Sequence, residues 1–175
     1  MPTGYVLFIS ETKLKSSTAV NLNVDVDLLL PFVKEAQKLY VETALGTDLT
    51  EHLKAEIVAG TLAGADKTLV DEYIGDMLPG YSLYHAFNYL RHKVENGNIF
   101  SKTSETGTAL TTAEAQSFRE EILNTASYYR ERMIDYICNN STSFPTYSTN
   151  TGADVNPSSE NYYNGMNVNT PVQNK

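Results

Sequence analysis

The chain of 175 residues contains a single cysteine, which limits the ways in which its fold can be stabilised. Cys138 cannot form an intramolecular disulfide, and a metal site built from several thiolates is excluded for the same reason. We expect Cys138 to be a small buried hydrophobic residue on a helix. The composition favours a protein made in a reducing cytoplasm, whose stability depends on a hydrophobic core.

Basic residues are few, at 13 Lys and Arg against 21 Asp and Glu, which gives a formal net charge of −8 and a pI of about 4.8. They form no continuous run along the chain. Binding of nucleic acid rests largely on clustered basic side chains. The composition therefore argues against a surface that holds DNA or RNA tightly.

Long apolar runs are absent as well, because no segment approaches the roughly 20 apolar residues that a membrane-spanning helix needs. The first residues, MPTGYVLFIS, lack the basic start, the long apolar stretch and the cleavage site of a signal peptide. The sequence therefore predicts a soluble protein with no membrane partner. Its length favours one domain with a substantial core.

Two amphipathic helical patterns meet at the Gly46-Thr47 joint. Asp27 can cap the first helix, and Pro31 falls within its opening turn, where a missing N–H costs little. Gly46 suits the left-handed residue that ends a helix, and Thr47 or Asp48 can cap the next helix. The two predicted apolar faces comprise Phe32, Ala36, Leu39, Tyr40 and Leu45, then Leu49, Leu53 and Ile57 before a stop at Gly60.

Two more helices are predicted between residues 66 and 96. We expect a kink or a short break between them at Pro79 and Gly80, and a stop at Asn96-Gly97. The apolar residues of these helices are Leu69, Val70, Tyr73, Ile74 and Met77, then Leu83, Phe87, Leu90 and Val94, with the hydroxyls of Tyr81, Tyr84 and Tyr89 expected at the rim of the core.

A polar insertion over residues 98–111 separates these helices from the last one. Loops of this length are usually functional or disordered. The Ile99-Phe100 pair and the β-prone Thr and Ser residues around it favour a β-hairpin as the alternative to a long loop, with Glu105 and Gly107 near its tip.

The last helix is predicted to be the longest. Thr111 and Glu114 have the spacing of a capping box, and apolar residues recur through Ile137. A helix over 112–139 would be about 40 Å long. The sequence thus predicts an all-α fold, a bundle of about four to five helices over residues 25–140, with an extended amino-terminal arm (1–24) and a polar low-complexity tail (141–175).

The three histidines do not form a recognisable catalytic or metal-binding motif. His85 and His92 lie near one face of the fourth predicted helix, about two turns apart and too far apart for one metal ion. His52 lies beside acidic residues in the second helix. We expect all three to be partly exposed helix residues, so the sequence predicts no catalytic residue, no metal ligand and no bound cofactor.

Ser10 and Lys13 match the S-x-x-K pattern of serine acyl enzymes, but the companion motifs of those enzymes are missing. Capping of a short helix explains this pair better. The twelve tyrosines are the clearest compositional excess, and tyrosine is favoured at protein interfaces. The alternative is that several line the rim of the core, which we favour for Tyr73 and Tyr129.

Four blocks in order resemble the head–tail connector, or neck ring, proteins of tailed phages that infect Bacteroidetes, including crAss-like phages. The blocks are LFISETKLK, LLLPFVKEAQKLYVETALGTDLTEHL, DKTLVDEYIGDMLPGYSLYHAFNYL and ASYYRERMIDYICNNSTSFPTY, within residues 7–147. The most specific parts are P-x-x-K-x-A-Q…LGT-x-L, from Pro31 to Leu49, and DEYI…Y-x-L-Y-x-A, from Asp71 to Ala86. Residues 148–175 lie outside the resemblance.

The resemblance implies a small helical adaptor without catalytic activity, located in the virion at the junction of head and tail. Proteins of this kind assemble into rings, commonly of twelve copies, beneath the portal protein. The ring contacts the portal and neighbouring tail or neck proteins. Double-stranded DNA passes through its channel without specific binding, which agrees with the negative charge of this chain.

Non-globular segments at both ends and the insertion are the expected contact regions of such a ring. The residues expected at these interfaces are Tyr5, Phe8, Ile9, Ile99, Phe100, Glu105, Phe144, Tyr147, Tyr162 and Tyr163. Two other hypotheses stay open at this point. One is a cytoplasmic helical adaptor that binds a partner peptide in a groove. The other is an enzyme whose site forms only between subunits, with His85, His92 and nearby acids.

Overall fold

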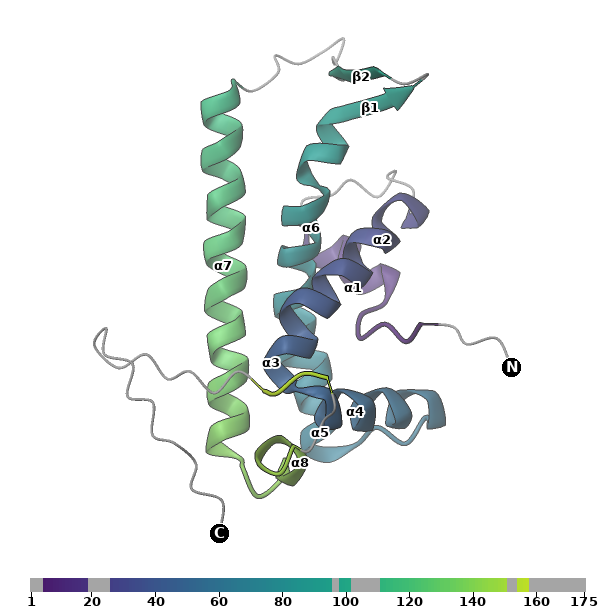
Figure 1. Cartoon of the computed structure of the whole chain (residues 1–175), viewed down its shortest axis with the longest axis vertical. Coiled ribbons are helices and arrows are strands. Elements are labelled where there is room, and N and C mark those ends of the chain that lie inside the picture. Colours follow the sequence, from purple (N-terminus) through teal and green to yellow (C-terminus); the bar gives the residue numbers. More distant parts are fainter. Residues whose placement is uncertain (1–4, 19–25, 96–97, 102–110, 151–153, 158–175) are drawn as a thin grey trace, which may run out of the picture.

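Helices make up most of the described residues in this computed structural model, which describes residues 5–18, 26–95, 98–101, 111–150 and 154–157 (Figure 1). The predicted all-α bundle is confirmed. In chain order the elements are α1 (Glu11–Ser17), α2 (Val26–Ala36), the π-helical turn η1 (Gln37–Glu42), α3 (Thr43–Leu45), α4 (Thr47–Ala59), α5 (Gly64–Thr68), the π-helical turn η2 (Leu69–Ile74), α6 (Gly75–Arg91), β1 (His92–Glu95), β2 (Asn98–Ser101), α7 (Thr112–Asn139) and α8 (Pro145–Ser148).

Three helical rods form the body, and α6 lies between the other two. The first rod runs continuously through α2, η1 and α3, the second through α5, η2 and α6, and the third is α7. The α6 helix packs against α2 on one side and against α7 on the other (Figure 1). Their shared core is fully buried and includes Leu45, Leu49, Leu53, Leu69, Ile74, Met77, Leu78, Met133 and Ile137.

The π-helical turn η1 changes which residues of the first rod face the core. Gln37 and Val41 are fully buried there, whereas Leu39 is 48% exposed. The prediction that Leu39 belongs to the buried stripe is therefore wrong. A π-turn contains one residue more than an α-turn, so it rotates every later side chain around the helix axis. Gln37 begins the turn and lies four residues after the buried Val33, so this polar side chain lies on the buried face of the rod.

The second rod continues without interruption through Pro79 and Gly80, so the expected break between two helices is wrong. Pro79 lacks the N–H that would bond the carbonyl of Gly75. The π-turn η2 ends at Ile74, the residue before that carbonyl. Gly80 has a packing reason, since a Cβ at this position would lie 3.0 Å from the Cβ of Ala126 on α7.

A short antiparallel hairpin follows α6. Its register pairs Lys93 with Phe100 and Glu95 with Asn98. The helix was expected to continue through Val94 to a stop at Asn96-Gly97, but it ends at Arg91 and Val94 lies in β1. Ile99 and Phe100 do lie on a β-strand, as the hairpin alternative expected, but that strand pairs with β1, which precedes the insertion. The expected tip at Glu105 and Gly107 lies outside the described residues.

The last helix agrees with its prediction in full. The α7 helix spans Thr112–Asn139, and the Thr111 side chain accepts from the Glu114 N–H while the Glu114 carboxylate accepts from the Thr111 N–H. This helix runs along the whole long axis of the molecule (Figure 1). Among the described residues, no helix is both long enough and apolar enough to cross a bilayer.

Both ends of the domain were placed incorrectly from the sequence. The arm contains a helix, α1, whose amino terminus is capped by Ser10, as its hydroxyl accepts from the Lys13 N–H at 3.2 Å. At the other end, Phe144 is 1% exposed and Tyr147 8% exposed, so the polar segment after residue 140 continues the core. The single thiol was also misplaced, because Cys138 is exposed.

Candidate functional site

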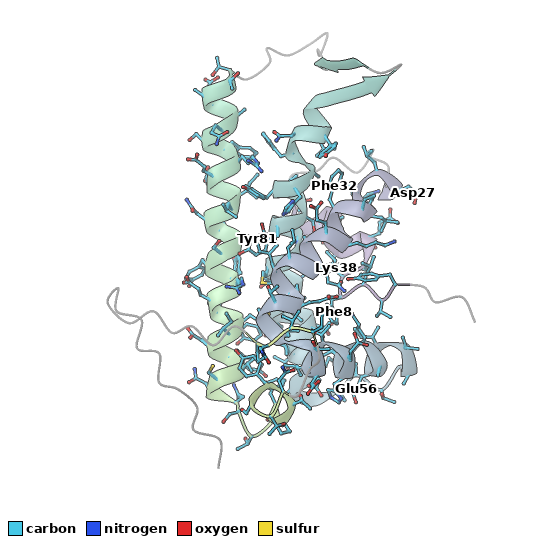
Figure 2. All side chains as sticks on the ribbon, viewed as in Figure 1. Phe8, Asp27, Phe32, Lys38, Glu56 and Tyr81 are labelled. Carbon is cyan, nitrogen blue, oxygen red and sulfur yellow. The ribbon has the colours of Figure 1, made fainter. Side chains whose placement is uncertain are left out.

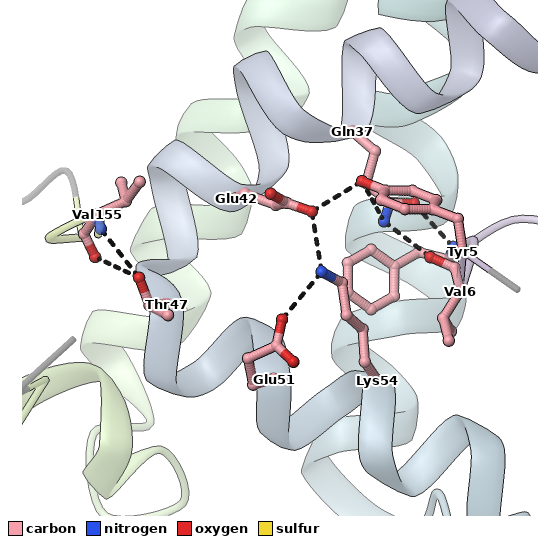
Figure 3. A network of polar contacts seen from close by, with 9 residues as sticks. Tyr5, Val6, Gln37, Glu42, Thr47, Glu51, Lys54 and Val155 are labelled. Carbon is pink, nitrogen blue, oxygen red and sulfur yellow. Dashed lines mark hydrogen bonds and ion pairs between the residues drawn. The ribbon is translucent and has the colours of Figure 1, made fainter. Parts of the chain in front are cut away.

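A buried glutamine fixes the amino-terminal segment to the first rod. The Gln37 amide nitrogen donates to the carbonyl of Val6 at 3.0 Å, and its oxygen accepts from the N–H of Phe8 at 3.1 Å (Figure 3). The Gln37 side chain thus gives the backbone of the amino-terminal segment one donor and one acceptor, as a paired β-strand would. Phe8 and Ile9 are thereby held in the core, at 6% and 8% exposure.

Tyr5 lies beside this amide within a charged network. Its hydroxyl donates to Glu42 at 2.9 Å, and the Lys54 ammonium donates to Glu42 at 3.0 Å and to Glu51 at 3.1 Å (Figure 3). Burial raises the pKa of Tyr5, and its bond to Glu42 raises it further. Burial alone would lower the pKa of Lys54, but the bonds to both carboxylates raise it overall.

A second polar contact joins the chain after α8 to the start of α4. The Thr47 N–H donates to the carbonyl of Val155 at 3.0 Å, and the Thr47 hydroxyl accepts from the N–H of Val155 at 2.9 Å (Figure 3). The Asp48 N–H donates to the side-chain oxygen of Asn150 at 3.1 Å. The prediction that Thr47 or Asp48 caps α4 with its own side chain is therefore wrong. We call the segment 149–150 and 154–157 the carboxy-terminal strap.

Aromatic and hydroxyl groups connect the three rods at mid-height. The rings of Tyr40 and Tyr81 stack with centroids 3.6 Å apart, and the Tyr81 hydroxyl donates to Ser127 on α7 at 3.2 Å. Burial raises the pKa of both tyrosines. Tyr81 is 2% exposed, so the expectation that it lies at the rim is wrong, because α7 covers it (Figure 2).

Two histidines, His52 and His85, take part in contacts between helices. His85 lies 3.1 Å from the Tyr40 hydroxyl, whereas His92 is on strand β1. The expectation that His85 and His92 share one helical face is therefore wrong, since the helix ends between them. His52 lies 3.2 Å from Asp66, and with Glu56 these residues bring three ligand atoms within 4.8 Å of one another. They are the residues that could hold a metal ion, and in this structure they connect α4 to α5.

Two open grooves border the rods. One, of about 260 Å³, lies between α6 and α7 and is lined by Leu83, Phe118 and Ile122. The other, of about 530 Å³, lies between the amino-terminal segment, α4 and the second rod, and it is lined by Leu7, Ile57 and Leu62.

Most of the predicted interface residues that the structure describes belong to the chain's own fold. Phe8, Ile9, Phe144 and Tyr147 are buried in the core, so their side chains do not form an exposed contact surface. Tyr5 is half-buried against Glu42, and Ile99 and Phe100 lie on strand β2. Glu105, Tyr162 and Tyr163 lie outside the described residues. Aromatic side chains in polar segments indicated an interface, but here they anchor those segments to the body.

The residues that close the fold were missed from the sequence for a clear reason. Gln37 carries a weak signal, since it is a polar residue next to the predicted apolar stripe. Val155 carries none, because its partner Thr47 is 108 residues away. The carboxy-terminal strap ends at Pro157, whose side chain packs against Gly46.

A family model of unknown function, DUF6712, matches residues 41–157, more than half of the chain. The chain belongs to the DUF6712 family. No curated protein and no solved structure matches it. The DUF6712 range contains α4 and the described strap residues that bind it.

Proposed function

We propose that this chain is a structural virion protein, a ring-forming head–tail connector that joins a phage head to its tail beneath the portal and extends the DNA channel. In this role it has no catalytic activity. The four ordered blocks that resemble connector proteins are the starting point, and three of them build the rods of the body.

The observation that carries the proposal is a projecting arm formed by the upper parts of α6 and α7 with the β1–β2 hairpin. Figure 1 shows this arm extending beyond α1, α2 and α4. Two large apolar side chains on it are exposed, Tyr89 at 59% and Phe118 at 42%. A subunit that projects such an arm has a surface suited to another protein, as exposed apolar groups often mark interaction sites.

The base of the arm is stiff enough to serve as a docking element. The Arg119 guanidinium lies 3.9 Å from the centre of the Tyr84 ring and donates to the Tyr84 carbonyl at 3.5 Å. The rings of Phe87 and Phe118 lie 5.8 Å apart. These contacts couple α6 to α7 above the core, so the arm keeps its geometry without the help of a partner.

The charge of the chain supports a channel through which DNA passes freely. At a net charge of −8 the surface carries an excess of carboxylates. A channel that must release DNA at ejection benefits from repulsion, because phosphate contacts would hold the duplex. The expected partners are further copies in a ring, commonly of twelve, the portal protein and the neighbouring neck or tail proteins.

The mass of the purified protein and the phenotype of particles that lack it test this function together. Light scattering and electron microscopy of the isolated neck are expected to reveal a ring of this chain, and particles without it should fail to join tails or to retain DNA. A protein that stays monomeric, with particles that still assemble and keep their DNA, would overturn the proposal.

The groove of about 530 Å³ favours a second candidate, a helical adaptor that binds a partner peptide. Its apolar lining, with Leu7, Ile57 and Leu62, would accept the apolar face of a short helix. Gene neighbours decide between the two functions, since an adaptor needs no portal, terminase or capsid genes beside it. Substitution of Leu62 by Glu would abolish adaptor function but leave ring assembly intact.

A further inference from the structure

The outer surface of α7 carries an acidic stripe. Residues Glu121, Asn124, Tyr128, Glu131 and Asp135 follow one another at spacings of three or four, and all five are exposed. This spacing places them on one side of the helix, where Glu121 also borders the groove between α6 and α7. We call them the outer α7 face. Among the described residues, no cation forms an ion pair with its three carboxylates, and the nearby Arg132 lies over the ring of Tyr73 instead.

The outer surface of the first rod carries two exposed lysines, beside the exposed carboxylates of Asp27 and Glu35. Lys34 and Lys38 are exposed, and within the described structure their ammonium groups contact only the Tyr5 ring, at 5.9 and 5.6 Å from its centre. Glu35 lies between them in sequence, but its carboxylate is 3.8 Å from His85 on α6. With the exposed side chains of Leu28 and Leu39, these two lysines form what we call the α2–η1 face.

The two faces lie on different rods, and α6 packs against both rods (Figure 1). Figure 2 labels Lys38 on the first rod, away from α7. Each face also contains exposed apolar side chains. Tyr128 on the outer α7 face is 59% exposed, and Leu39 and Leu28 on the α2–η1 face are 48% and 46% exposed. When two complementary patches lie on different sides of a molecule, the patch of one copy binds the other patch of the next copy, which is a head-to-tail contact. Such contacts form a closed ring when the rotation between neighbouring copies divides a full turn into whole steps. Complementary charge sets the register, and an exposed aromatic at the centre of the patch supplies affinity.

We infer that the α2–η1 face of one copy docks on the outer α7 face of the next copy. This inference rests on the proposed ring function and specifies the contact between its subunits. A second copy fits better than nucleic acid, because the α7 face repels phosphate and the α2–η1 face offers only two unpaired lysines. Each copy then uses both faces, so every subunit in the ring makes the same two contacts.

Charge reversal on each face tests the pairing. In the full chain, K34E/K38E and E131K/D135K are each expected to raise the concentration needed for half-assembly by about tenfold or more, because like charges then meet. In the variant with all four substitutions, the acidic side chains lie on the α2–η1 face and the basic ones on the outer α7 face, so the two faces attract each other again. This variant should assemble better than either double variant. Sedimentation velocity gives the assembled mass, and circular dichroism checks that each variant is folded.

Two matched variants control for net charge away from both faces. Lys67→Glu and Glu72→Lys change exposed residues near the start of the second rod and should leave assembly unchanged. The proposed pairing would be overturned if both double variants assembled like the wild type, or if the quadruple variant assembled no better than either double variant. Neither result would contradict ring formation as such. Duplex DNA binding that K34E/K38E removes, with assembly intact, would also overturn it. A wild-type chain that never assembles, with particles that do not need it, overturns the proposed function instead.

Discussion

Gly46 and Pro157 touch so closely that a Cβ on Gly46 would lie 2.7 Å from the Cδ of Pro157. The contact closes the strap over the start of α4, beside the bonds between Thr47 and Val155. Gly46 also has φ +77° and ψ 169°, a combination that is essentially restricted to glycine. The joint between the first two long helices therefore depends on a residue without a side chain and on a proline far along the chain.

Gly46→Ala is expected to destabilise the fold by about 2–4 kcal/mol, from backbone strain and from the clash with Pro157 together. Denaturant unfolding measures the loss. Gly60→Ala is the reference, since Gly60 has φ +70° but no atom within 4 Å of an added Cβ, so it should cost only about 1 kcal/mol. Pro157→Ala should recover part of the loss in the Gly46→Ala background. Equal costs for the two glycine substitutions would show that the strap contact contributes nothing.

Gln37→Met is expected to cost about 2–4 kcal/mol, although methionine has a similar shape. The substitution removes the hydrogen bonds of the amide to Tyr5, Val6 and Phe8, and it leaves the Val6 carbonyl and the Phe8 N–H without this partner in the folded chain. Hydrogen exchange at Phe8 should accelerate before exchange in α7 does, because the amino-terminal segment loses its anchor. Gln116→Met, at an exposed position on α7, is the control and should change neither quantity by much.

The Tyr147 ring provides a prediction in alkaline solution. Burial raises its pKa from 10.0 to about 12, so the folded state favours the protonated hydroxyl. This contribution is fully present below pH 10 and is lost as the pH rises towards 12. Tyr147→Phe should therefore lose less stability than the wild type between pH 10 and 12. An ultraviolet titration of the wild type minus the variant should report a phenol that ionises near pH 12, and ionisation near pH 10 would contradict the burial of this ring.

The parts of the fold that could be predicted from the sequence are those specified by local residues. Thr111 and Glu114 lie three residues apart, so their capping box and the start of α7 could be read directly. The π-turn at Gln37 could not, because its extra residue depends on what the helix packs against. The end of α6 was misread because an Asn-Gly dipeptide can follow a helix or stand between two paired strands, and here the residues on both sides of it pair as strands.

The candidate site was less predictable than the fold because its contacts are distant in sequence. Phe144 and Tyr147 stand in a segment rich in Ser and Thr, which suggested an interface, yet both complete the core. The outer α7 face could have been found, since Glu121, Tyr128 and Glu131 repeat at helical spacing in a helix whose limits were predicted correctly. Its counterpart could not be found in full, because the sequence placed Leu39 in the buried stripe, whereas the structure exposes it.

Gly80→Val tests the close approach of α6 and α7 that supports the arm. A Cβ at Gly80 already comes within 3.0 Å of the Ala126 Cβ, so a branched side chain must separate the two helices. The expected loss is about 2–4 kcal/mol, larger than the helix-propensity gain of removing a glycine. Ala126→Gly removes the opposing Cβ and should return part of this loss in the double variant, so the two changes are non-additive. Additive effects in denaturant unfolding would show that the helices do not meet at this point, and the arm would then need another anchor.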